Sequence, residues 1–129
     1  MLSNTLNMIV VIIIFMLSSI LSLIMLYSNP LGFPTIFIGS LYYLSASFII
    51  LAISKRVDFS IEKDEAIKIA YIIMFSLYFI NAVVMSAVVF FDSPTDNIND
   101  TYKGATTYLL SSIIILYSIY ITYNKVKNE

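Results

Sequence analysis

Four long runs of apolar residues, none containing a charge, constrain this 129-residue chain more than any other feature. A helix needs about 20 predominantly apolar residues to cross about 30 Å of hydrocarbon at 1.5 Å per residue, so each run is long enough. They therefore predict four membrane-spanning helices. The runs cover residues 6–27, 35–54, 69–91 and 105–123.

The composition agrees with membrane insertion. Hydrophobic residues make up 60% of the chain and charged residues only 12%, whereas soluble domains have about 45–50% apolar and about 25% charged residues. A soluble domain of this size could not hide so many apolar side chains, because its surface must still face water. The chain is therefore expected in the cell membrane as a multi-pass protein. Its richness in Ile, Tyr, Ser and Asn, without Cys, His or Trp, is typical of an AT-rich genome such as that of a thermophilic archaeon.

The connections between the runs carry the signals that end and start helices. Pro30 and Pro34 end the first helix and reverse the chain. The charged segment 55–65 contains acidic residues that suit the positive N-terminal end of the third helix. Pro94 marks the end of that helix. We expect one all-α domain over residues 1–129, a four-helix antiparallel transmembrane bundle with helices at about 6–27, 35–54, 62–91 and 104–124.

Basic residues are distributed unevenly between the two ends of this bundle. With four spans, both termini and the segment 55–65 lie on one side of the membrane. Of the basic residues, only Lys103 lies on the other side. Short loops rich in Lys and Arg stay in the cytoplasm, so both termini are expected there. Six of the seven basic residues fall on the cytoplasmic side: Lys55, Arg56, Lys63, Lys68, Lys125 and Lys127.

Asp, Glu, Lys and Arg are absent from the interior of all four runs. Proton-coupled transporters and voltage sensors need such groups at bilayer depth, and the small multidrug antiporters depend on a glutamate that residues 6–27 lack. Without His or Cys the chain also lacks the usual transition-metal ligands, an imidazole acid–base group and thiolate chemistry. We expect no catalytic activity, no metal and no cofactor. A net charge of −1 makes nucleic acid an improbable partner.

Small and polar residues recur at helical spacing on every run. Such residues let helices approach closely in lipid, where packing and hydrogen bonds drive association. Asn81 shares a helix face with Tyr71 and Tyr78. It either hydrogen-bonds a neighbouring helix, which we favour, or belongs to a polar seam in a substrate path or in a pocket for a quinone or lipid headgroup. The candidate helix-packing or partner-contact residues are Ser18, Ser22, Gly39, Ser40, Tyr71, Tyr78, Asn81, Ala82, Ser86, Thr107, Ser111 and Ser118.

Two further features lie near the ends of the runs. Asn99-Asp100-Thr101 is a candidate N-glycosylation triplet on the outer side, although such triplets are more often unused. Tyrosines with one apolar and one wet end anchor helices at the membrane surface. The predicted anchors are Tyr27, Tyr102, Tyr108, Tyr120 and Tyr123.

These observations favour a small non-catalytic protein that acts as an accessory, structural or assembly subunit of a larger membrane complex, for example of the respiratory or oxygenase type. That choice is an argument by class and not by motif. Its partners are membrane lipids and other integral membrane subunits. The alternative is a small homo-oligomeric transporter, flippase or channel for neutral or lipid-like cargo, with Tyr78 and Asn81 in its path.

Overall fold

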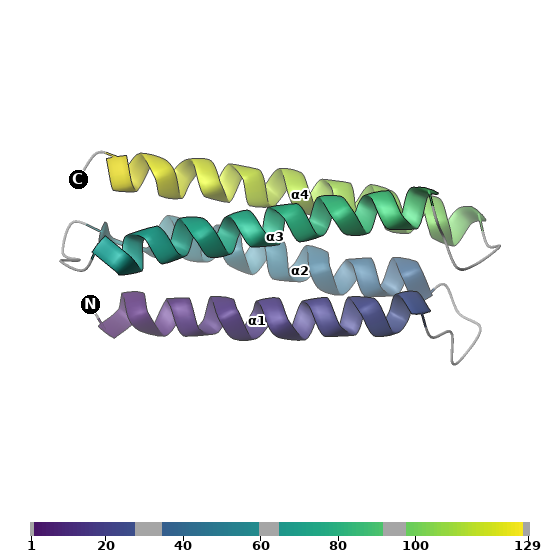
Figure 1. Ribbon diagram of the computed structural model, residues 1–129, viewed down its shortest axis with the longest axis horizontal. Helices are drawn as coiled ribbons and strands as arrows, with labels where there is room; N and C mark the ends of the chain where they lie inside the picture. Colours follow the sequence, from purple (N-terminus) through teal and green to yellow (C-terminus); the bar gives the residue numbers. More distant parts are fainter. Residues whose placement is uncertain (1, 28–34, 60–64, 92–97, 128–129) are drawn as a thin grey trace.

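The computed structural model describes residues 2–27, 35–59, 65–91 and 98–127, and four helices account for nearly all of them (Figure 1). Each helix is long and apolar enough to cross a membrane. The predicted all-α fold class is confirmed for the described residues. The helices are α1 (Leu2–Tyr27), α2 (Thr35–Arg56), α3 (Glu65–Phe91) and α4 (Ile98–Lys127).

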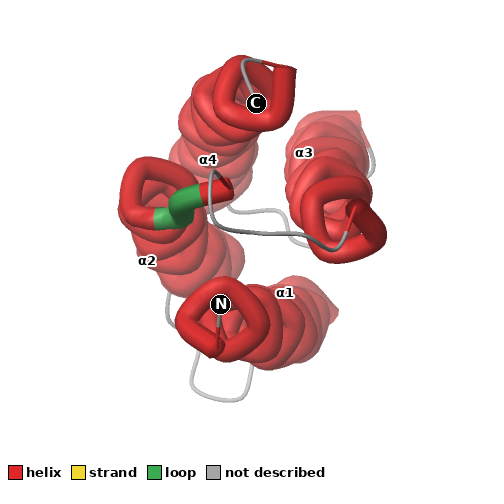
Figure 2. The backbone as a smooth tube through the Cα atoms, turned by 90° about the vertical axis from the view of Figure 1, so that its left-hand side faces the viewer, coloured by secondary structure: helices red, strands yellow, loops and turns green. Residues whose placement is uncertain are grey.

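The helices run alternately in opposite directions, so that Leu2 and Lys127 lie at the same end of the bundle (Figure 1). Seen end-on, α4 lies beside both α2 and α3 and packs closely against each of them (Figure 2). The α1 helix packs mainly on α2 and less on α3, while α2 and α3 approach each other at few points. The spatial order is therefore α1, α2, α4, α3, and the ring is loosest between α3 and α1.

Three helices extend beyond the bounds that apolarity predicts. The α4 helix begins at Ile98 and not near residue 104, α2 continues to Arg56, and α1 begins at Leu2. For these three helices the prediction followed the ends of the apolar runs to within a residue, but a helical backbone continues through polar residues that water can solvate. Asn, Asp and Thr are also favourable at a helix start. The structure describes α3 from Glu65, and residues 62–64 lie outside the described part.

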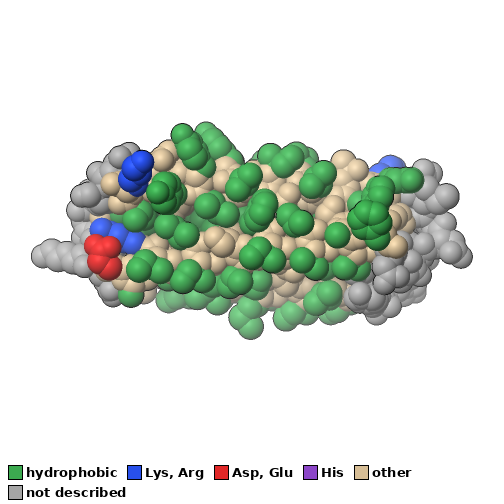
Figure 3. Space-filling model, turned by 45° about the horizontal axis from the view of Figure 1, so that its top comes forward, with side chains coloured by type: hydrophobic (Ala, Val, Ile, Leu, Met, Phe, Trp, Pro, Cys, Tyr) green, Lys and Arg blue, Asp and Glu red, His purple; other side chains and the backbone are tan. Residues whose placement is uncertain are grey.

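The bundle exposes large apolar side chains and buries aromatic rings together with small hydroxyl side chains. Side chains such as Ile20, Phe48, Ile80 and Ile113 are about half exposed. Figure 3 shows hydrophobic side chains along the molecule, with the coloured charges near its two ends. The buried polar and charged residues are Ser18, Ser22, Ser40, Ser47, Ser54, Lys68, Thr107, Ser111, Ser112, Ser118 and Thr122.

The inward face of α3 has a regular spacing of three and four residues. This spacing keeps one stripe of side chains facing the neighbouring helices, as in coiled coils. On this stripe the Tyr78 ring meets Phe15 of α1 and Tyr43 of α2, and the Tyr71 ring meets Phe59. The buried residues are Lys68, Tyr71, Phe75, Tyr78, Ala82, Met85 and Val89.

Candidate functional site

A cluster of polar side chains lies halfway along the bundle and joins three helices. It consists of Ser19 of α1, Tyr43 of α2, and Tyr78 and Asn81 of α3; we call it the tyrosine–asparagine cluster. Asn81 Nδ2 donates hydrogen bonds to Ser19 Oγ at 3.0 Å and to the Tyr43 hydroxyl at 3.1 Å. The Tyr43 hydroxyl in turn donates to the backbone carbonyl of Tyr78 at 2.9 Å.

Aromatic rings extend the cluster across the bundle. The Tyr78 hydroxyl donates to the Val11 carbonyl at 3.1 Å, and its ring meets Phe15 edge-on at 4.5 Å between centroids. Tyr43 makes edge-to-face contacts with Tyr78 at 6.1 Å and with Tyr108 at 5.7 Å. Such contacts contribute about 0.5–1.5 kcal/mol each beyond burial. The rings thus link α3 to α1 and to α2, which its backbone approaches at few points, and link α2 to α4.

The cluster has the chemistry of a contact between helices. Both amide hydrogens of Asn81 and both tyrosine hydroxyl protons are donated to protein groups. A carboxamide is not a base, and the cluster holds no ionisable group that titrates near neutral pH. The described residues contain no group of three or more potential metal ligands. The geometry therefore supports the helix-contact interpretation of Asn81.

Most buried serines and threonines bond within their own helix. Ser111 Oγ donates to the Thr107 carbonyl at 3.0 Å, and Ser118 Oγ donates to the Ile114 carbonyl at 3.0 Å. Within the described part of the chain, no buried side-chain polar atom lacks a partner. Because their hydroxyls are satisfied locally, these residues act toward neighbouring helices as small spacers.

Two serines instead donate to the backbone of a neighbouring helix. Ser22 Oγ of α1 donates to the Gly39 carbonyl of α2 at 3.2 Å. Ser86 Oγ of α3 donates to the Ala105 carbonyl of α4 at 2.9 Å. Hydrogen bonds between helices contribute about 0.6–2 kcal/mol in lipid. Together with the tyrosine–asparagine cluster they link α1 to α2, and α3 to α1, α2 and α4.

Lys125 closes the end of α2 from the last turn of α4. Its Nζ donates to the carbonyls of Ser54 and Lys55 at 2.8 Å each and to that of Val57 at 2.7 Å. Carbonyls at a helix C-terminus lack partners within the helix and carry the negative end of its dipole, so an ammonium group suits them. Lys125 therefore joins α4 to α2.

Lys68 lies at the same end of the bundle, but it forms an ion pair within its own helix, α3. Its side chain is 8% exposed, and its Nζ lies 3.3 Å from Glu65 Oε1. Nearby, Phe59 is buried behind α2 and meets the Tyr71 ring at 5.4 Å. The short segment after α2 thus covers this end of the bundle. The charge of the buried Lys68 is balanced by its ion pair with Glu65.

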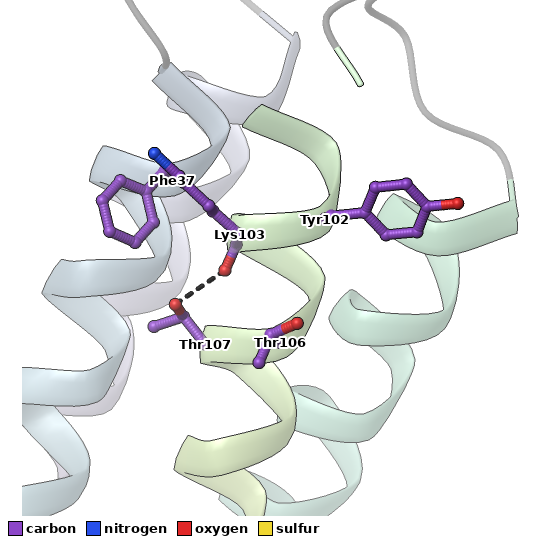
Figure 4. Close-up of a pocket in the computed structure, with 5 residues that line it drawn as sticks. All are labelled: Phe37, Tyr102, Lys103, Thr106 and Thr107. Carbon is purple, nitrogen blue, oxygen red and sulfur yellow. Dashed lines mark hydrogen bonds between the residues drawn. The ribbon is translucent and has the colours of Figure 1, made fainter. Parts of the chain in front are cut away.

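An open hollow of about 300 Å³ lies at the opposite end, between Phe37 in the first turn of α2 and residues 102–107 of α4 (Figure 4). Lys103 Nζ lies 5.7 Å from the centre of the Phe37 ring, and Tyr102 points away from that pair. The Thr107 hydroxyl donates to the Lys103 carbonyl at 2.7 Å. Because these polar groups do not converge, the hollow offers a cation–π contact between helices and not a ligand site.

The twelve candidate packing residues all lie on inward or helix-facing positions. Asn81 and Ser86 are half-buried, and each donates to a neighbouring helix. Asn81, Tyr71 and Tyr78 are not a single cluster, because Tyr71 packs further along α3 against Phe59 and Phe75. The buried members are Ser18, Ser22, Gly39, Ser40, Tyr71, Tyr78, Ala82, Thr107, Ser111 and Ser118.

Tyr108 does not lie where the sequence predicts. It is 1% exposed and packs against Tyr43, so its assignment as a surface anchor is wrong. The prediction used only its depth along the helix, whereas its turn position places it on the same face as Ala105 and Ser112. Tyr102, Tyr120 and Tyr123 are exposed. The side chains of Tyr27 and Asn99 lie outside the described residues.

The contact residues absent from the predicted set include Ser19, Tyr43 and Lys125. Ser19 lies beside the predicted Ser18–Ser22 pair, and a lone lysine near a terminus gives no sign of its carbonyl partners 68 to 71 residues away. The chain matches no protein-family model, no curated protein and no solved structure.

Proposed function

We propose that this protein is inserted in the cell membrane with both termini in the cytoplasm, and that it is a non-catalytic accessory, structural or assembly subunit of a larger membrane complex. Two observations support insertion. The surface between the ends of the bundle is lined by large exposed apolar side chains. Lys55, Arg56 and Lys127 are exposed at one end and Lys103 at the other, as the positive-inside rule requires.

The accessory role is supported mainly by the way in which the interior polar groups are hydrogen-bonded. In a transporter, groups at bilayer depth face cargo or water for part of the cycle. Here the donors of Tyr43, Tyr78 and Asn81 are committed to neighbouring helices. An interior committed to its own contacts, beneath a continuous apolar surface, suits a protein that packs beside others.

Placement in the membrane is tested with single cysteines, because the chain has none of its own. A membrane-impermeant thiol reagent is added to intact cells that produce Lys103→Cys or Lys127→Cys. We expect labelling of Lys103→Cys before permeabilisation and of Lys127→Cys only after it. Labelling of Lys127→Cys in intact cells contradicts the orientation, and equal labelling of both in intact cells contradicts insertion.

The accessory role is tested by solubilising the native membrane gently and measuring the mass with which the protein migrates. We expect stoichiometric migration with other integral membrane chains in one large complex. A homogeneous self-oligomer that moves solute in liposomes would instead support the transporter, flippase or channel alternative.

A further inference from the structure

The interface between α1 and α3 has the least packing of the four interfaces around the ring. The α4 helix packs closely against both α2 and α3, and α1 packs on α2, whereas α1 and α3 approach each other at few points (Figure 2). The apolar span of α1 also has the smallest buried share of the four, 22%, compared with 39% for α4 and 44% for α2. Because packing drives helix association in lipid, this interface has the least to hold it closed.

Tyr78 and Asn81 of α3 hold α1 by three side-chain contacts, which we call the α1–α3 latch. The Tyr78 hydroxyl donates to the Val11 carbonyl at 3.1 Å, and Asn81 Nδ2 donates to Ser19 Oγ at 3.0 Å. The Tyr78 ring meets the Phe15 ring edge-on at 4.5 Å between centroids. The latch covers about two turns of α1, so a few polar contacts supply what backbone packing does not.

The contact between α1 and α2 has a different basis. Ser22 is buried and donates to the Gly39 carbonyl of α2 at 3.2 Å. Gly39 has no side chain, which lets the two backbones approach closely. The α1 helix packs on α2 more extensively than on α3. If the latch breaks, α1 therefore keeps its contact with α2.

We propose that the bundle opens at the interface between α1 and α3, by a movement of α1 on α2, and that the latch controls this opening. The open state leaves the Tyr78 hydroxyl and one amide hydrogen of Asn81 without acceptors in hydrocarbon, so the closed state predominates. The open state is expected at roughly 0.1–10% of the population. It faces lipid and not water, so it forms no path across the membrane. The proposal rests on the membrane insertion proposed above but not on the accessory role.

The test measures distances between helices by double electron–electron resonance on the full chain in liposomes. The chain has no cysteine, so spin labels are placed in pairs by cysteine substitution at exposed positions. Ile20→Cys with Ile80→Cys spans α1 and α3. Ile80→Cys with Ile113→Cys spans α3 and α4, and Ile20→Cys with Leu41→Cys spans α1 and α2.

The latch is weakened by combining Ser19→Ala with Tyr78→Phe, which removes its two hydrogen bonds and keeps the ring contact. Each lost bond is expected to raise the ratio of open to closed protein roughly 3- to 30-fold. We therefore expect a second, longer distance between the labels on α1 and α3 in this double variant. The pairs that span α3 and α4 and that span α1 and α2 keep a single distance.

Ser86→Ala is the matched control, because it removes a hydrogen bond from α3 to the Ala105 carbonyl of α4. The extensive packing between α3 and α4 is expected to keep this interface at a single distance. A second distance between α3 and α4 in Ser86→Ala contradicts the proposal, because the loss of a bond would then open any interface of the bundle.

An unchanged single distance between α1 and α3 in the double variant overturns the opening. A second distance between α1 and α2 overturns the movement of α1 on α2, because α1 then leaves both neighbours. A second distance between α3 and α4 in the double variant also overturns the proposal, since it indicates general loosening. The cysteine labelling of Lys103→Cys and Lys127→Cys separates this proposal from membrane insertion. Expected labelling with a closed α1–α3 interface refutes the opening alone, while failed insertion refutes both.

Discussion

Single side chains in this protein act by hydrogen bonds that cross between helices, and Asn81 makes two of them. We predict that Asn81→Leu lowers the free energy of unfolding by about 1–2 kcal/mol, because it removes the bonds to Ser19 and Tyr43. Unfolding in mixed micelles with a denaturing detergent measures the change. Ser76→Ala is the control, because Ser76 bonds the Ile72 carbonyl of its own helix, and its effect stays within about 0.5 kcal/mol. Equal effects of the two substitutions contradict the contact role of Asn81.

Lys125 and Lys127 offer a second comparison of neighbouring residues. Lys125 donates to three carbonyls, whereas Lys127 is exposed. We predict that Lys125→Met lowers the free energy of unfolding by about 1.5–3 kcal/mol, the cost of losing bonds from a charged donor. Lys127→Met changes it by less than about 0.5 kcal/mol. The same unfolding measurement tests this prediction. Comparable losses of unfolding free energy in both variants rule out the role of Lys125 in capping α2.

At this scale the sequence predicts residue size better than residue partners. Small residues at helical spacing identify inward positions such as Ser22 and Ser111, because close approach depends on local spacing. The partners of Lys125 and the burial of Tyr108 depend on how the helices are rotated relative to one another. No local pattern in the chain contains that rotation.

The helices differ in how they use their faces. The α4 helix contacts both α2 and α3, and its inward face carries small hydroxyl residues. We predict that Ser111→Leu costs about 1–3 kcal/mol of unfolding free energy by overpacking a fully buried position. Thr106→Leu, exposed on the same helix, is the matched control and is expected to leave stability nearly unchanged. If Ser111→Leu instead stabilises the protein, close approach of α4 does not depend on small residues.

Helix existence and order follow from apolar length, but helix ends do not. Four apolar runs of sufficient length predict four helices, and the described structure contains them. The early start of α4 at Ile98 lies in polar sequence, where apolarity gives no signal. The solvated residues there continue the helix without belonging to the apolar span.

For the whole molecule, the sequence predicts an antiparallel bundle but not the spatial order of its helices. The peripheral place of α1 shows why. Among its described side chains only Val11, Ser18 and Ser22 are buried, yet its apolar residues are distributed almost all round. A helix that lipid can surround does not reveal which face meets protein. Gly39 of α2, which accepts from Ser22, and Tyr78 and Asn81 of α3 together determine that face.

The central claim is that the interior polar groups hold the helices together and do not line a path. It is tested most directly in liposomes with Ser19→Cys and Ser111→Cys, which are nearly isosteric changes in a chain without cysteine. A water-soluble, membrane-impermeant thiol reagent is applied to both sides, with the exposed Lys127→Cys as control. We predict modification of Lys127→Cys and no modification of the two interior cysteines. Reaction of Ser19→Cys or Ser111→Cys at a rate comparable to Lys127→Cys contradicts the claim, because it requires a water-filled path between the helices.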